Sequence, residues 1–197
     1  MCSLLRSLIT VLPLSALSHL VATAAEPPTC EGVEKLWIDL GSQDAATSHR
    51  VIDQLVARPA RAVAFLEKHL RPISTPDPCH VAGWLADLDS DDFATRERAT
   101  QALEKACEVV ESALLKELSR SSSLEARWRI KDLLARVRAE RLFPSVERIR
   151  VVRAVEVLER IGNEPARRIL SALARGAWEA QLSLEARAAL KRLETLR

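Results

Sequence analysis

Few side chains in this chain have the types and spacing that catalysis or metal binding requires. Three of the four histidines follow residue 25 (His49, His69 and His80), and none belongs to a His-Glu-x-x-His motif. Cys79 and His80 are neighbours, but adjacent side chains rarely share a metal, and no second Cys or His pair supports them. Five scattered glycines cannot form a phosphate-binding loop. We therefore predict no catalytic residues, no metal and no cofactor, and we expect that the protein is not an enzyme.

Cysteine chemistry is equally limited. Cys30, Cys79 and Cys107 follow residue 25, so at most one disulfide can form among them. Cys30 and Cys79 lie in proline-rich stretches and could be bridged in an oxidising compartment, although the sequence does not decide the pairing. Cys107 falls at the end of a predicted helix, where we expect it to act as a small buried apolar residue.

Arginine is the abundant side chain with binding chemistry. From Glu26 to Ser119 the chain carries 10 Lys/Arg against 17 Asp/Glu, whereas from Arg120 to Gly176 it carries 14 against 7. Arg and Glu interleave at helical spacing in the basic stretch, which is typical of solvated outer helix faces. If this stretch has a binding function, the candidate contact residues are Arg127, Arg129, Arg150 and Arg153. The helices over 127–168 could then bind a polyanion, either nucleic acid or an acidic polysaccharide.

The elements that must position these arginines are helices. Ala, Leu, Glu and Arg dominate the composition, and they lose little on entering a helix. The absence of tyrosine and the scarcity of glycine and phenylalanine argue against a sheet. The sequence therefore predicts an all-α fold.

Trp84 and Trp128 lie on or beside apolar stripes and are expected in the core, whereas Trp178 follows Gly176 in a turn and is expected at the surface.

Three segments of the chain repeat one another in register, anchored on Leu55, Leu103 and Leu158. An arginine precedes each anchor by five residues: Arg50, Arg98 and Arg153. Offsets of 48 and 55 residues between the anchors predict helical hairpins, each burying its apolar face against the next. We expect seven to nine helices, one continuous core, and separate helices through Leu103 and Leu114. The recurring arginine favours a structural role in bridging neighbouring helices.

The N-terminus and the prolines divide the chain. Residues 1–25 combine a single charge at Arg6, an apolar run and the small residues Ala22-Thr23-Ala24-Ala25, which is the layout of a signal peptide. We expect cleavage between Thr23 and Glu26 and an extracytoplasmic location, periplasmic or secreted. The apolar run is too short and broken to span a membrane, so we expect no membrane association unless it stays uncleaved. The rest comprises an N-terminal helical segment with the first hairpin (26–71), a Pro-rich linker (72–79) and helical repeats (80–197).

Four stretches carry a resemblance to a known family: LWIDL from Leu36, RAVAFLEKHLRP from Arg61, ADLDSDDFATRERAT from Ala86 and RAVEVLERIG from Arg153. They resemble HEAT-like repeats of the phycobilisome-lyase type, and in particular the helical C-terminal module of WD-repeat proteins of planctomycete bacteria. The resemblance covers roughly residues 33–197. It implies an α-solenoid of HEAT-like antiparallel helical hairpins that serves as a protein-interaction scaffold without catalytic residues. A propeller precedes the module in that family, whereas a signal-like segment precedes it here, as in a stand-alone exported copy or a fragment of a larger protein.

The expected function follows from this architecture. We predict a non-catalytic HEAT-like repeat scaffold that binds a protein or peptide partner through its concave face. Nucleic acid is a poor candidate partner because export separates the protein from it. Binding of a polyanion, the alternative, would weaken steeply as salt rises.

Overall fold

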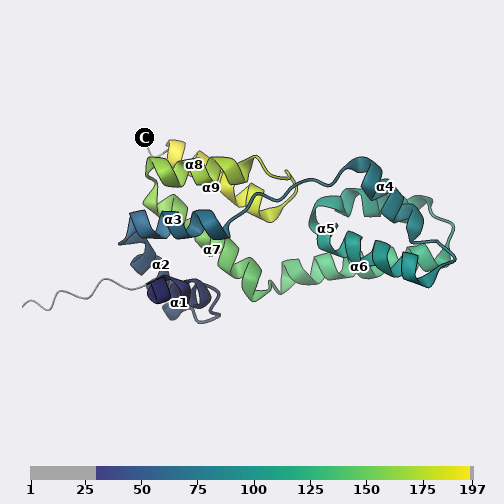
Figure 1. The fold of residues 1–197 in the computed structure, drawn as a ribbon, viewed down its shortest axis with the longest axis horizontal. Coiled ribbons are helices and arrows are strands. Elements are labelled where there is room, and N and C mark those ends of the chain that lie inside the picture. The colour runs from purple at the N-terminus through teal and green to yellow at the C-terminus, as the bar shows by residue number, and fades with distance from the viewer. Residues whose placement is uncertain (1–29, 196–197) are drawn as a thin grey trace, which may run out of the picture.

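The computed structural model describes residues 30–195, which form nine α-helices and no strand (Figure 1). The predicted all-α fold is therefore confirmed for this part of the chain. The helices are α1 (Cys30–Leu40), α2 (Ala45–Val56), α3 (Pro59–His69), α4 (Pro78–Asp87), α5 (Phe93–Arg120), α6 (Leu124–Leu142), α7 (Val146–Ile161), α8 (Glu164–Ala174) and α9 (Gln181–Thr195). The predicted signal peptide over residues 1–25 lies outside the described residues.

Polar residues at the predicted boundaries set where the helices begin and end. The Asp92 carboxylate accepts hydrogen bonds from the backbone N–H of Thr95 at 2.8 Å and from its hydroxyl at 2.6 Å, and so caps α5. Ser145 caps α7 in the same manner by accepting from the backbone of Arg148. Gly162 ends α7 with φ at 57°, a left-handed conformation that glycine adopts at little cost.

The helices form two lobes, each with a core of its own. The first lobe comprises α1, α2, α3, α7, α8 and α9, and the second comprises α4, α5 and α6 (Figure 1). The repeat anchors Leu55 and Leu158 are buried in the first core, and Leu103 is buried in the second. The prediction of one continuous core is wrong, because the non-helical segment 70–77 carries the chain out of the first lobe before α4 begins.

The order of packing also differs from the expected one. Helix α7 contacts α1, α2 and α3 as well as α8 and α9, so the third copy of the repeat packs on the first. The loop between α8 and α9 ties the lobes together, since Ala177 and Ala180 are buried in the second core. The Ala177 backbone N–H also donates to the carbonyl of Ile73 at 2.6 Å. Ile73 packs against both cores and so joins the two lobes from the linker side.

Helix α5 contains both segments that the repeat predicts as separate helices, and it bends back on itself. A straight helix would place Thr100 and Leu118 about 27 Å apart. Yet Arg127 donates to the Leu118 carbonyl, and Arg129, two residues later on α6, donates to the Thr100 hydroxyl. Both ends of α5 must therefore lie beside the start of α6, and Figure 1 shows the ribbon of α5 turning back. The predicted break is wrong because every residue from Phe93 to Arg120 is helical, but the chain reverses as expected.

Gly176 is required where the lobes meet. A Cβ atom at this position would lie 2.6 Å from Ser183 Oγ and 3.0 Å from the Ile73 carbonyl oxygen, both from segments that pack around the α8–α9 loop. We expect Gly176→Ala to lower the free energy of unfolding by about 1–3 kcal/mol, the usual cost of overpacking a tight site. Chemical denaturation followed by circular dichroism measures this change.

Gly83→Ala is the matched control. Gly83 lies within α4, and a Cβ there would meet nothing within 4 Å. The control should raise stability by about 0.4–1 kcal/mol, because alanine restricts the unfolded chain more than glycine does. Equal effects of the two substitutions would contradict the close approach at Gly176.

Candidate functional site

The four candidate arginines do not form one surface. Arg127 and Arg129 lie on α6 in the second lobe, whereas Arg150 and Arg153 lie on α7 in the first lobe. Each pair contacts other parts of the same chain, and these contacts decide how far the side chains are free to bind a partner.

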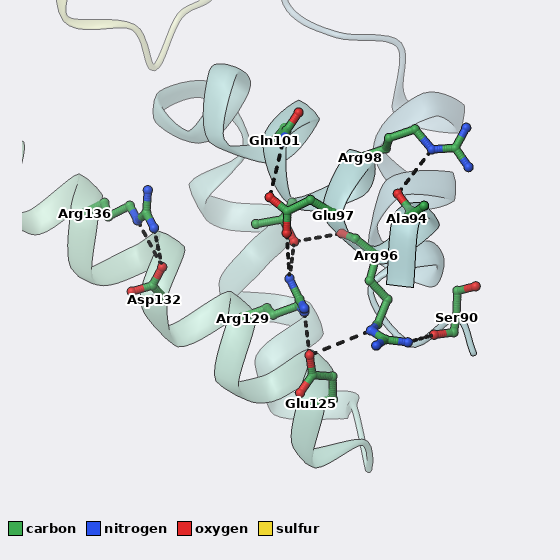
Figure 2. A network of polar contacts seen from close by, with 11 residues as sticks. Ser90, Ala94, Arg96, Glu97, Arg98, Gln101, Glu125, Arg129, Asp132 and Arg136 are labelled. Carbon is green, nitrogen blue, oxygen red and sulfur yellow. Dashed lines mark hydrogen bonds and ion pairs between the residues drawn. The ribbon is translucent and has the colours of Figure 1, made fainter. Parts of the chain in front are cut away.

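Arg129 and Arg127 hold α6 against α5. Arg129 is almost fully buried, and its Nε donates to the Glu125 carboxylate at 2.7 Å while Nη1 donates to Thr100 Oγ1 at 3.0 Å. Figure 2 shows Arg129 between the carboxylates of Glu125 and Glu97, the latter 3.6 Å away on α5. Arg127 Nη1 donates to the carbonyl oxygens of Leu118 and Ser121, which have no partner within the last turn of α5. Both side chains thus stabilise the second lobe.

Arg153 and Arg150 hold α7 against α1. Arg153 Nη1 donates to the carbonyl oxygens of Leu40 and Ser42 at the end of α1. The Arg150 guanidinium pairs with Glu147 and lies over the ring of Trp37, 5.5 Å from the ring centroid. Since Arg153 bonds two backbone carbonyls through a single nitrogen, its remaining donors are unused by the described residues.

The arginines at the shared repeat position have different surroundings. Arg153 joins α7 to α1, as a bridging role predicts. Arg98 bonds only within its own helix, to the Ala94 carbonyl and the Thr95 hydroxyl. Arg50 is exposed on α2, and its side chain forms no hydrogen bond or ion pair with another described residue. The bridging role is therefore seen at one of the three positions, that of Arg153.

The acidic and basic halves of the chain pair with each other. Arginines of the later half form ion pairs with acids of the earlier half: Arg129 with Glu97, Arg136 with Glu104, Arg148 with Glu108, Arg141 with Glu111 and Arg160 with Asp53. Hydrogen bonds that Arg136 donates to Asp132 and to Glu104 raise the pKa of its guanidinium above the ordinary value. Exposed pairs of this kind contribute little to the free energy of unfolding, because solvent screens them. Their main effect here is to neutralise charge that would otherwise be available to a polyanion.

The tryptophans and cysteines divide between core and surface. Trp84 is partly buried against the second core, and Trp178 is exposed, as predicted. The prediction for Trp128 is wrong: its side chain is 64% exposed, because α6 buries Ala126 and Ile130, and Trp128 falls midway between them on the opposite face. Cys79 is an exposed free thiol, and the side chain of Cys30, its candidate partner, lies outside the described part of the structure. Cys107 is half-buried, and burial raises the pKa of its thiol, which keeps it protonated.

A groove opens between α4 and the second arm of α5, the part from Val109 to Arg120. Its volume is about 480 Å³. We call it the α4–α5 groove; apolar residues form most of its wall, namely Val81, Ala82, Leu85, Ala86, Val109, Val110 and Ala113. Lys116, Glu117 and Arg120 line one end. No sequence pattern predicts this groove, because Ala82 and Ala86 follow no repeat and their exposure depends on how α4 packs on α5.

A second hollow, the junction pocket, lies where α6 meets α7 and α9 begins. Its volume is about 410 Å³, and its lining residues are Arg141, Pro144, Arg148, Ile149, Val152, Arg153 and Gln181. It contains one of the four candidate arginines, Arg153. Arg141 and Arg148 belong to the predicted basic helices over 127–168, but they are not among the candidate contact residues. The sequence does not predict that they line a pocket with Arg153, because this depends on the turn at residues 143–145.

We expect Arg129→Ala to lower the free energy of unfolding by about 1–3 kcal/mol, the value of hydrogen bonds to charged groups. The partner carboxylates of Glu97 and Glu125 are nearly half exposed, so water can solvate them once the guanidinium is gone. Lys131→Ala, on the exposed face of the same helix, should change stability by less than about 0.5 kcal/mol. Urea denaturation compares the two, and a loss no larger than that of the control would refute the structural role of Arg129.

Residues 30–195 contain no group of three or more His, Cys, Asp or Glu side chains placed to hold a metal ion. Within the same residues, no helix combines the length and apolar character needed to cross a membrane. Compared with known proteins, the chain matches no family model, no curated protein and no solved structure.

Proposed function

We propose that this protein is a non-catalytic scaffold that binds a protein or peptide partner, and that the α4–α5 groove is the binding surface. The observation that carries the proposal is an open hollow of about 480 Å³ with a mainly apolar wall. Ala82 and Ala86 are exposed in it, so small side chains leave room for larger ones from a partner. Hollows of this size and character are where proteins commonly bind ligands and peptide anchors.

The groove suits the apolar face of an amphipathic helix. Val81 and Leu85 on α4 and Val109 and Ala113 on α5 are each four residues apart, so both walls present rows of apolar side chains along a helix. A partner helix would place residues at i, i+3 or i+4, and i+7 between these rows. This arrangement buries apolar surface on both partners without leaving backbone groups unpaired.

Charges at one end of the groove add a requirement on the partner. Lys116 and Arg120 line this end, and their side chains make no ion pair or hydrogen bond with other described residues. Glu117 lies between them in sequence and is likewise without a partner among the residues described. Two cations against one acid favour a partner with an acidic residue beside its apolar face.

The finer architecture belongs to the same proposal. The helices around Leu55, Leu103 and Leu158 are each followed by a reversal and a second helical stretch, which supports a short α-solenoid of HEAT-like hairpins packed out of chain order. We place the protein outside the cytoplasm, on the strength of the signal-like layout of residues 1–25. In that location a protein or peptide is the partner that a non-catalytic helical scaffold would meet.

Polyanion binding is the weaker alternative. Five of the arginines between 127 and 168 pair with acids from the earlier half of the chain, and Arg150 pairs with Glu147. Counterion release requires free cations that follow a phosphate or sulfate backbone. The pairing leaves few such cations on these helices.

Peptide display against the purified protein tests the proposed groove. Random peptides of about 15 residues, long enough for several helical turns, should yield sequences with apolar residues at i, i+3 or i+4, and i+7 and an acid nearby. Ala82→Arg should abolish their binding, because a long charged side chain would fill the groove without disturbing a core residue. Ala64→Arg, at an exposed position on α3, should leave it intact.

Two results would overturn the groove as the binding surface. The first is selected peptides that bind wild type and Ala82→Arg equally well. The second is binding that falls by about one power of ten in affinity per neutralised charge for each tenfold rise in salt, which would favour the polyanion alternative.

A further inference from the structure

We propose that the junction pocket binds a carboxylate attached to an apolar group. This site is separate from the α4–α5 groove and shares no lining residue with it. Three arginines, Arg141, Arg148 and Arg153, line one pocket together with apolar side chains. Such a combination matches a ligand that carries one planar anion and a short hydrocarbon part.

The guanidinium groups are incompletely used by the protein. Arg148 reaches Glu108 and Gln181 through a single nitrogen, Nη2, and both contacts are long at 3.4 Å. Arg153 likewise uses only Nη1, for the carbonyl oxygens of Leu40 and Ser42. The Nε and the second terminal nitrogen of each therefore have no partner among the described residues. None of these atoms is both buried and unpaired, so the spare donors reach solvent.

Arg141 differs from the other two because its guanidinium already forms a two-pronged pair with Glu111. That pair shows how a carboxylate fits a guanidinium fork at this place in the fold. Arg148 and Arg153 present comparable forks with spare donors and no carboxylate in a two-pronged contact. A ligand carboxylate can therefore bind them without displacing Glu108 or Glu111 from their present partners.

The remaining wall of the pocket is apolar. Pro144, Ile149 and Val152 line it, and the neighbouring Leu142 and Phe143 are 73% and 81% exposed. These two adjacent residues extend the apolar wall onto the surface, and contiguous exposed apolar surface is a feature of interaction sites. An apolar group next to the carboxylate would contact this wall, whereas a hydrated polyphosphate or sulfated chain would leave it uncovered.

Titration calorimetry with matched acids and amides tests the pocket. The small probes are hexanoate and hexanamide, and the peptide probes are an N-acetylated alanine peptide ending in leucine, as the free acid and as the C-terminal amide. Each acid should bind at least about tenfold more tightly than its amide, since charge-assisted hydrogen bonds are lost with the charge. If the peptide acid binds more tightly than hexanoate, the natural ligand of the site is the C-terminus of a protein or peptide. If hexanoate binds as tightly as the peptide acid, the natural ligand is a small carboxylic acid.

Gln181→Glu is the decisive variant because it is nearly isosteric. It places a carboxylate beside Arg148 at the start of α9, where a negative charge suits the helix dipole. The change also removes the hydrogen bond from Gln181 Nε2 to Glu185 at 2.6 Å, so retention of folding is measured for this variant. This internal carboxylate should weaken binding of both acids by about tenfold or more. Arg148→Gln should do the same, and Arg192→Gln should not, because Arg192 pairs with Glu159 and does not line the pocket.

Three outcomes would overturn the proposal: equal affinity for acid and amide, undiminished acid binding by folded Gln181→Glu, or no binding of either acid to the wild-type protein. A negative result at the junction pocket would not contradict the proposal for the α4–α5 groove, because that proposal is tested separately, by the effect of Ala82→Arg on binding of the selected peptides. Circular dichroism of each variant confirms that folding is retained before binding is measured.

Discussion

Helix α7 is the element against which the first three and the last two described helices pack. Ala154, Val155, Val157 and Leu158 are buried, and the helix contacts three helices that precede it and two that follow it. Helices α2 and α3 form only a two-helix layer, and such a layer exposes one apolar side until a further element covers it. Arg153 adds to the apolar packing by bonding the carbonyl oxygens at the end of α1. The first lobe is therefore completed only when α7, which follows the second lobe in the sequence, packs on α1, α2 and α3.

Local features of the fold were predictable from the sequence, and the packing order was not. Helical periodicity identified the buried anchors Leu55, Leu103 and Leu158, because a 3.6-residue repeat is a property of each segment alone. The order in which the repeat copies pack depends on the path of the segment 70–77. The prolines of this segment predict that no helix continues there, but they do not predict its path. The position of Trp128 was missed because apolar residues lie close to it in sequence while the buried face of α6 runs through Ala126 and Ile130.

The candidate sites show the same division. Sequence composition identified the basic stretch, but not that its arginines would face the acids of the earlier half. A count of charges treats each half as a free surface, whereas folding turns opposite charges toward each other. The junction pocket could be anticipated only in part, since Arg153 and Arg148 are five residues apart on α7 but Arg141 joins them through the turn after α6. The α4–α5 groove depends on two helices joined by a turn and on alanines whose exposure no sequence pattern marks.

The split composition of the first lobe has a consequence for synthesis. A ribosome makes α1, α2 and α3 first, then the complete second lobe over residues 78–142, and only afterwards α7, α8 and α9. The helices of the second lobe come from contiguous chain and have short-range contacts, so they can pack together as soon as they emerge, before Ala177 and Ala180 complete their core. The first lobe has contacts of high sequence separation, and its early helices must wait with their apolar faces uncovered. During that interval this segment is the part of the nascent chain that most resembles a chaperone substrate.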